Sequence, residues 1–152
     1  MKLGDVLELT MPDGFHEMNA EEKNGLNFWN GVDGQCISYP EKHIIITVGF
    51  KKLGMLTSKL VSEDELVKKM EKSFECQPDY CSFGVIERNA GGKGIKGISY
   101  SYTAKDTPMF SESLVIKSGK NICYFHFYTR AVLKDDNIKI WLQMLEGIHW
   151  IS

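Results

Sequence analysis

The chain has 152 residues, a formal net charge of −2 and a pI near 6.1, and 43% of its residues are hydrophobic. This length suits a single globular domain, which we expect to span residues 1–152. The small net charge and the scattered lysines argue against nucleic-acid binding. No apolar run is long enough to cross a bilayer, so we expect no membrane insertion.

The start of the chain lacks the features of a targeting signal. It reaches an acidic residue at Asp5 and has no apolar stretch of the kind that signal peptides contain. We therefore expect a cytoplasmic protein, or a secreted protein or lipoprotein if a signal peptide has been removed.

The four cysteines are Cys36, Cys76, Cys81 and Cys123. Cys76 and Cys81 are spaced as CxxxxC, which is looser than the CxxC pairs of zinc and redox sites, and no second pair completes a tetrahedral site. We predict reduced cysteines in or near the core, because a free cysteine behaves as a small hydrophobic residue. A local disulfide and metal or redox chemistry are the alternatives.

The N-terminal third predicts strands separated by turns. Residues 3–10 alternate between apolar and polar and predict one half-buried strand, which ends at the Pro12-Asp13-Gly14 turn. Asn19 is a candidate cap for a short helical turn over 19–24. Residues 35–39 and 43–50 predict a hairpin, and residues 53–60 predict a loop.

Two helices are predicted from their capping residues and apolar spacing. Ser62 and Glu65 form a capping-box pattern, and the apolar residues that follow predict a helix over about 62–76, which ends before Pro78. Asp135 or Asp136 is the candidate cap of a second helix over 135–147, which ends at Gly147. The expected apolar faces are Leu66, Val67, Met70 and Phe74 in the first helix, and Ile138, Trp141, Leu142 and Leu145 in the second.

Between these helices the pattern predicts four consecutive strands. They cover about 80–88, 94–103, 109–117 and 121–130, and each connecting turn contains glycine or proline. Short connections between consecutive strands indicate an antiparallel meander. Residues 148–151 predict a short edge strand. The fold class is therefore α+β, an antiparallel sheet with a four-strand meander and two main flanking helices.

This order of elements resembles the PsbP-like fold family, which includes DcrB-type small bacterial proteins and a Ran-binding import factor. The pieces that carry the resemblance are the Pro12-Asp13-Gly14-Phe15 end of the first strand, the segments 97–102 and 117–124, and the closing helix before Ile148. The resemblance implies an α/β/α sandwich and a role in partner binding. It identifies no functional residue, because members of the fold have unrelated roles.

The meander predicts two sheet faces, because the alternating side chains of the four strands stack on opposite sides of the sheet. The expected core face contains Cys81, Phe83, Val85, Ile98, Tyr100, Tyr102, Leu114, Ile116, Cys123, Phe125 and Phe127. The opposite face is small and polar, and its candidate binding residues are Tyr124, His126, Tyr128, Arg130, Ser99, Ser101, Ser111 and Ser113. Tyrosine and arginine are enriched in recognition surfaces. The other interpretation is a half-solvated face, or one that the 35–50 hairpin partly covers.

Two functional hypotheses follow. The first is a non-catalytic domain that binds a protein or peptide. The second is a small-molecule-binding or hydrolytic domain in which His126 acts as general base for a neighbouring serine. The sequence contains neither a Gly-x-Ser-x-Gly elbow nor an HExxH pair, so we predict no catalytic residue, metal or cofactor. A homo-oligomer has no sequence feature in its support.

Overall fold

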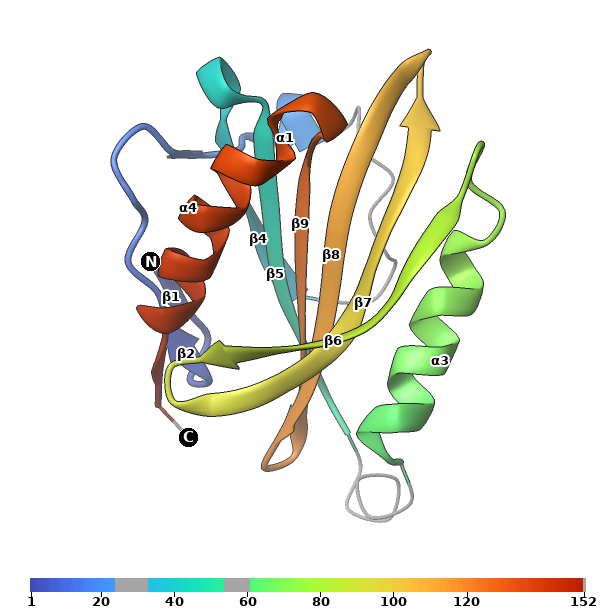
Figure 1. Cartoon of the computed structure of the whole chain (residues 1–152). Helices are drawn as coiled ribbons and strands as arrows, with labels where there is room; N and C mark the ends of the chain where they lie inside the picture. Colours follow the sequence, from blue (N-terminus) through green and yellow to red (C-terminus); the bar gives the residue numbers. More distant parts are fainter. Residues whose placement is uncertain (24–32, 54–60, 152) are drawn as a thin grey trace.

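The computed structural model describes residues 1–23, 33–53 and 61–151. Almost all of the loop predicted at 53–60 lies outside these ranges. The main sheet has seven antiparallel strands in the order β3-β4-β5-β9-β8-β7-β6 (Figure 1). Their bounds are His16–Glu17 (β3), Asp33–Tyr39 (β4), Ile44–Lys52 (β5), Asn121–Arg130 (β9), Thr107–Ser118 (β8), Lys93–Ala104 (β7) and Cys81–Ala90 (β6).

The predicted meander is confirmed as β6 to β9. The predicted hairpin also forms, as β4 and β5 joined by the 3-10 turn η1 (Pro40–Lys42). It does not cover a sheet face, however. β5 pairs with β9 along its whole length, so the hairpin extends the sheet beside the meander.

Tight turns set the register within the meander. β7 and β8 are joined by Lys105 and Asp106, which both have positive φ, at 48° and 65°. This two-residue turn places Ala104 opposite Thr107 and therefore Tyr100 opposite Ser111. Even-numbered residues of β7 consequently share a face with odd-numbered residues of β8.

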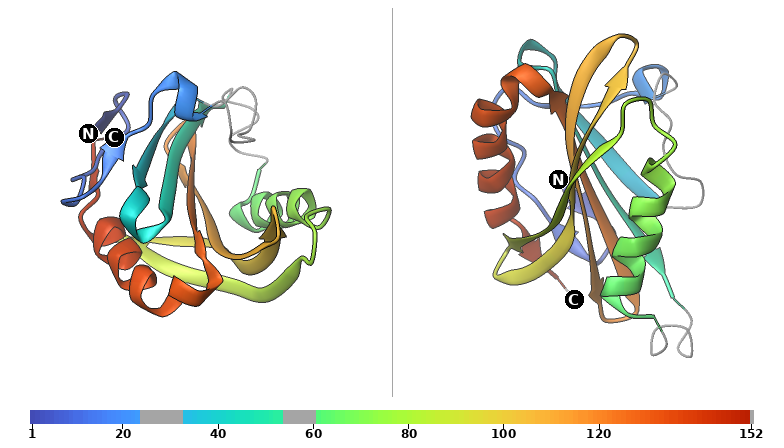
Figure 2. Two further views of the ribbon diagram at one scale, coloured as in Figure 1. Left: turned by 90° about the horizontal axis from the view of Figure 1, so that it is seen from above. Right: turned by 45° about the vertical axis from the view of Figure 1, so that its right-hand side comes forward.

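Two helices cover opposite faces of the sheet, which gives the predicted α/β/α sandwich (Figure 2). The helix α3 (Glu63–Phe74) starts at Ser62, whose Oγ accepts a hydrogen bond from the Glu65 N–H at 3.2 Å, as the capping pattern predicts. Its buried residues are Leu66, Val67 and Met70.

The helix α4 (Lys134–Glu146) follows the 3-10 turn η2 (Ala131–Leu133). Its N-cap is Leu133, so the prediction of Asp135 or Asp136 as the cap is wrong; both acidic residues lie in the first turn, where they complement the helix dipole. Gly147 ends the helix as predicted, because its N–H bonds back to the Gln143 and Met144 carbonyls at 3.2 Å.

The strand predicted over residues 3–10 is broken in two. β1 (Lys2–Leu3) and β2 (Leu7–Glu8) form a small hairpin, because Gly4 has a φ of 53° and the Val6 N–H bonds to the Leu3 carbonyl at 3.2 Å. The predicted C-terminal strand, β10 (His149–Trp150), pairs with β2 and completes a three-stranded sheet.

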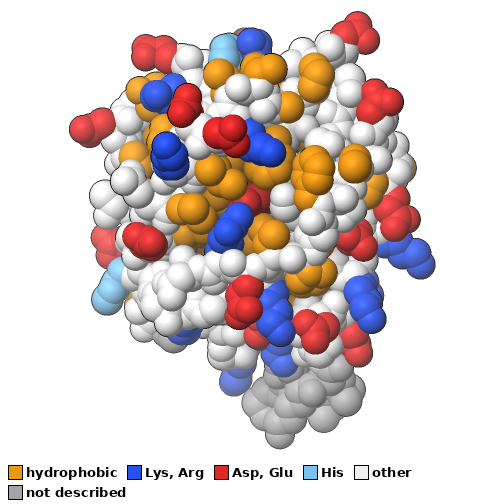
Figure 3. Space-filling view, in the orientation of Figure 1, with side chains coloured by type: hydrophobic (Ala, Val, Ile, Leu, Met, Phe, Trp, Pro, Cys, Tyr) orange, Lys and Arg blue, Asp and Glu red, His pale blue; other side chains and the backbone are white. Residues whose placement is uncertain are grey.

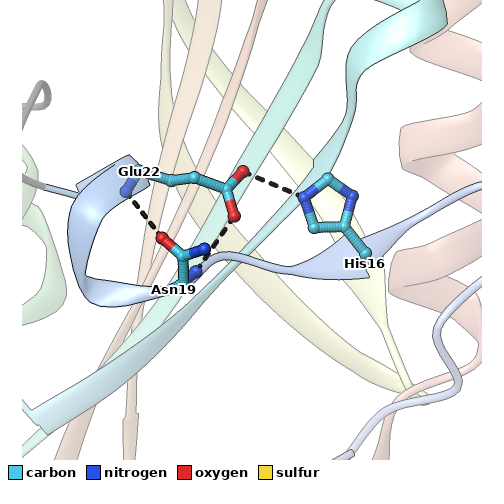
Figure 4. Close-up of polar contacts among 3 residues, drawn as sticks. All are labelled: His16, Asn19 and Glu22. Carbon is cyan, nitrogen blue, oxygen red and sulfur yellow. Dashed lines mark hydrogen bonds and ion pairs between the residues drawn. The ribbon is translucent and has the colours of Figure 1, made fainter.

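The short helix α1 (Ala20–Lys23) is held by a reciprocal capping box (Figure 4). Asn19 Oδ1 accepts from the Glu22 N–H at 2.8 Å, and Glu22 Oε1 accepts from the Asn19 N–H at 3.2 Å. The second Glu22 oxygen lies 3.0 Å from His16 Nε2, and this hydrogen bond is the main cause of the lowered pKa of Glu22. Asn19 therefore caps the helical turn as predicted.

Candidate functional site

The main sheet has two covered surfaces: the α3 face is the side that α3 covers, and the α4 face is the side that α4 covers. The register places six of the eight candidate residues on the α3 face. Ser113 lies opposite His126, and Ser111 lies opposite Tyr128. Tyr124 and Arg130 follow on the same side of β9.

The other two candidates are on the wrong face. Ser99 lies opposite Glu112 and Ser101 lies opposite Phe110, so both serines belong to the α4 face. The predicted division of the sheet is therefore inverted for β7, where Ile98, Tyr100 and Tyr102 share the α3 face with His126. In β6 the register shifts between Ser82 and Gly84, so Cys81 is on the α4 face as predicted, whereas Val85 lies opposite Ile98 on the α3 face. The prediction aligned the alternating residues of neighbouring strands without the parity that the two-residue turn and the register shift in β6 impose.

The centre of the α3 face is a buried row of neutral polar groups. The Ser113 Oγ lies 2.7 Å from His126 Nδ1 and 3.3 Å from the Tyr100 hydroxyl. Ser111 donates to the Phe127 carbonyl at 2.7 Å. His126 is only 2% exposed, and this burial lowers its pKa to about 3, so the imidazole is neutral at physiological pH.

The C-terminal end of α3 closes this row. The Phe74 ring stacks on Tyr100 with centroids 4.6 Å apart and meets the edge of His126 at 6.1 Å. The Ser113–His126 pair thus has the separation that a hydrolytic site requires, but Ser113 is fully buried. The hydroxyl is therefore not at the surface of the described structure, and the hydrogen bond links β8 to β9 beneath α3.

One end of the α3 face is more open. Met109 lies between Tyr102 and Arg130 in a cross-strand row, and Tyr128 lies in the next row, stacked on His126 at 6.0 Å. Arg130 is exposed, and the other three side chains are half-buried. Burial raises the pKa of Tyr102 and Tyr128, which therefore stay neutral. We call these four residues the tyrosine–arginine margin.

The α4 face contains a buried charge that the sequence did not predict. Glu112 is 0% exposed, and its oxygens accept from Arg88 Nε at 3.0 Å and Arg88 NH2 at 2.6 Å. The Trp141 indole donates to the same carboxylate at 3.0 Å. The hydrogen bond to Glu112 raises the pKa of Arg88. A single Glu in the middle of a strand carries no sequence signal of this kind.

Hydrophobic side chains are also exposed on the surface. The space-filling view shows that they gather over the strands between α4 and β6, among several lysines and arginines (Figure 3). Among the described residues, Phe83 is 56% exposed, Val85 71% and Val132 87%. The Lys134 ammonium lies 5.7 Å and 5.2 Å from the ring centroids of Phe83 and Phe110.

An open hollow of about 470 Å³ lies at the start of α3. Its lysines are engaged: Lys117 donates to the Val61 carbonyl at 2.9 Å, and Lys96 lies 3.5 Å from Asp64. The helix start is capped by Ser62 and followed by three acidic residues, so it offers no positive charge to an anion.

Metal ligands do not gather anywhere in the part of the chain that the structure describes, and none of its helices is long and apolar enough to span a membrane. All four cysteines are free thiols; Cys36 and Cys123 are buried, and Cys76 and Cys81 are exposed.

Neither the models of known families nor the curated proteins include a match to this chain. Solved structures do match it. The cyanobacterial PsbP (CyanoP) of Synechocystis superposes with a TM-score of 0.67 over 98% of this chain and 89% of its own, at 13% identity. The chain has the PsbP-like fold.

Two further solved structures agree with this PsbP-like assignment. LpqN of Mycobacterium tuberculosis, a protein involved in cell envelope biogenesis, has a TM-score of 0.63 and 13% identity over 95% of this chain and 82% of its own. A Pseudomonas aeruginosa protein of unknown function has a TM-score of 0.54 and 10% identity over 68% of this chain and 69% of its own. At these identities the likeness concerns the fold alone, and proteins that share a fold can have unrelated functions.

Proposed function

We propose that this PsbP-like domain binds a protein or peptide partner through the tyrosine–arginine margin. The observation that supports this is the grouping of four recognition-type side chains at one end of adjacent strands. In the part of the chain that the structure describes, no side chain bonds to the Tyr102 or Tyr128 hydroxyl or pairs with the Arg130 guanidinium. These polar tips can therefore bond to a partner.

The two tyrosine rings of the margin are packed against the buried row, which lowers the entropic cost of ordering them on binding. Tyr102 packs on Tyr100 with centroids 5.8 Å apart, and Tyr128 stacks on His126. The buried candidates His126, Ser111 and Ser113 thus support the margin from beneath and do not contact the partner. Half-buried Tyr124 lies on the same face of β9, two positions beyond His126.

The margin also indicates the chemistry of the partner. Tyrosine, methionine and arginine are enriched at protein interfaces and in their energetic hot spots. The exposed Arg130 cation favours a partner that supplies a carboxylate beside an apolar side chain.

The test compares the capture of partners from an extract of the native host by immobilised wild-type domain and by charge-reversed variants. We expect Arg130→Glu to weaken capture about tenfold or more, because it replaces attraction by repulsion at the margin. Tyr102→Phe keeps the ring and removes only the hydroxyl, so its expected loss is smaller. The matched control is Lys139→Glu, the same charge change at an exposed position on α4.

Each variant must retain the wild-type unfolding midpoint. If Arg130→Glu captures the same proteins as the wild type and as Lys139→Glu, the margin is not the binding surface and the proposal fails.

A further inference from the structure

β6 is the end strand of the seven-stranded sheet. It pairs with β7 on one side only, and its other edge has no strand partner among the described residues. The strand is ten residues long. An edge of this length presents a row of backbone N–H and C=O groups that can bond to a further strand.

Natural proteins protect such edges with bulges, charges or prolines. β6 has a bulge between Ser82 and Gly84, where Gly84 has a φ of 100° and its N–H is satisfied by the Ser82 Oγ at 3.1 Å. This device protects the start of the strand. Its end is covered as well, because Ala90 is buried and its carbonyl accepts a hydrogen bond from the Trp150 indole at 2.7 Å. The free part of the edge lies between these two ends. Immediately beyond the bulge, Val85 is 71% exposed.

Apolar surface therefore flanks this edge on both sides. The Val85 side chain is on the α3 face, opposite Ile98 of β7. The Phe83 ring, 56% exposed, packs against Phe110 of the α4 face with centroids 6.1 Å apart. A strand added to β6 can therefore bury apolar side chains on both of its faces.

The charges around β6 are mostly negative. Glu71, Glu75 and Asp79 lie at the end of α3 and in the turn that leads into β6, and Glu87 lies on β6 itself. None of these carboxylates takes part in the three ion pairs of the described residues, which are His16–Glu22, Arg88–Glu112 and Lys96–Asp64. The C-terminal pole of α3 adds a further partial negative charge at the same end.

The cations near this edge offset only part of this charge. Arg88 is engaged by Glu112, and Lys134 lies over the Phe83 and Phe110 rings. Lys96, which lies opposite Glu87 on β7, is 3.5 Å from Asp64. Lys72, in the last turn of α3, offsets one of the four carboxylates, so the charge around this edge stays negative.

We infer that the free edge of β6 binds an extended segment of a partner protein, in which apolar side chains alternate and lysine or arginine residues flank them. The backbone edge supplies the hydrogen bonds, Phe83 and Val85 supply the apolar contacts, and the carboxylates attract the basic flanks. A second copy of the chain is disfavoured, because antiparallel pairing of two β6 strands brings the acidic start of one against Glu87 of the other.

This inference is independent of the tyrosine–arginine margin. The two surfaces involve different residues, and they select partners of opposite charge because Arg130 favours a carboxylate.

The probe is a capped synthetic peptide of about ten residues that alternates valine and threonine and carries lysines at both ends. Its counterparts carry glutamates at the ends, or prolines in place of the central valines. We expect the lysine-ended peptide to bind about tenfold more tightly than the glutamate-ended one, with an affinity that falls as salt is added. It should also slow hydrogen exchange at β6 amides that do not bond to β7.

Val85→Lys should weaken binding of the lysine-ended peptide about tenfold, because it places a cation on the edge. The matched control is Val132→Lys, the same substitution at an 87% exposed valine outside the sheet, which should bind like the wild type. Equal binding by the two variants would overturn the inference. Three other results would also overturn it. These are unchanged hydrogen exchange at the β6 amides when the peptide is bound, and binding of the proline-containing peptide as tight as that of the lysine-ended peptide. The third is dimerisation of the domain through β6 in the absence of peptide.

Discussion

The two faces of the sheet solve the burial of polar groups in different ways. On the α4 face a fully buried carboxylate, Glu112, is held by two Arg88 nitrogens and the Trp141 indole. On the α3 face the buried polar groups are the uncharged hydroxyls and imidazole of Tyr100, Ser113 and His126.

This difference determines what each face is sensitive to. A buried charge is stable only while its partners are present, because losing one leaves the other uncompensated in a medium of low dielectric constant. A buried neutral imidazole needs no counter-charge, but it must take up a proton as the protein unfolds in acid. The α4 face should therefore respond to mutation of the ion pair, and the α3 face to pH.

Arg88→Met should have the largest effect on stability. Among the described residues it leaves the buried Glu112 carboxylate with only the Trp141 indole as a donor, and we expect the free energy of unfolding to fall by about 3–5 kcal/mol. Denaturant-induced unfolding at neutral pH measures this change.

The double variant Arg88→Met/Glu112→Leu is the control, because an apolar pair of similar volume often replaces a buried ion pair without loss. It should recover most of the lost stability. A double variant as unstable as the single one would show that the site depends on packing shape and not on the charge balance.

Acid should destabilise the domain through His126. Its pKa is lowered from 6.5 to about 3 in the folded state, so the unfolded chain binds the additional proton. The stabilisation is complete above pH 6.5 and is lost as pH falls toward 3, with a slope of up to about 1.4 kcal/mol per pH unit. The total is of the order of a few kcal/mol, and unfolding curves recorded at a series of pH values measure it.

His126→Gln isolates this contribution, because glutamine can still bond to Ser113 but does not titrate. The pH dependence of the difference between the two proteins should be confined to pH values below about 6.5, since contributions of the other groups cancel. If the free energy of unfolding falls identically in the two proteins below pH 6.5, His126 is not held neutral in the folded state.

Much of the fold was predictable because local signals agree with the final packing. The Ser62 capping box, the positive-φ turn at Lys105-Asp106 and the glycine turns each act within a few residues of the chain. The N-terminal strand was predicted incorrectly because its local alternation does not agree with the final packing. The alternation over residues 3–10 favours one strand, but Gly4 adopts a left-handed conformation and returns the chain on itself.

The candidate site was only partly predictable. Alternation along β9 correctly places Tyr124, His126, Tyr128 and Arg130 on one side, but the face that each neighbouring strand contributes depends on the exact turn length. Ser99 and Ser101 were misplaced for this reason. The burial of His126 depends on where Phe74 of α3 lies, and the pairing of Arg88 with Glu112 depends on the order of strands in the sheet. Neither is encoded in a short stretch of sequence.

Ser62→Ala should have the smallest effect and bears on how the α3 face is covered. α3 loses the hydrogen bond from the Glu65 N–H, whereas α4 starts at Leu133 and has no side-chain cap to lose. We expect the free energy of unfolding to fall by about 1 kcal/mol, with hydrogen exchange accelerated in the first turn of α3 before it changes in the sheet. Ser62→Asp should retain the cap and behave like the wild type. If Ser62→Ala leaves the exchange of α3 unchanged, packing of Leu66, Val67 and Met70 alone holds the helix over the buried His126–Ser113 pair.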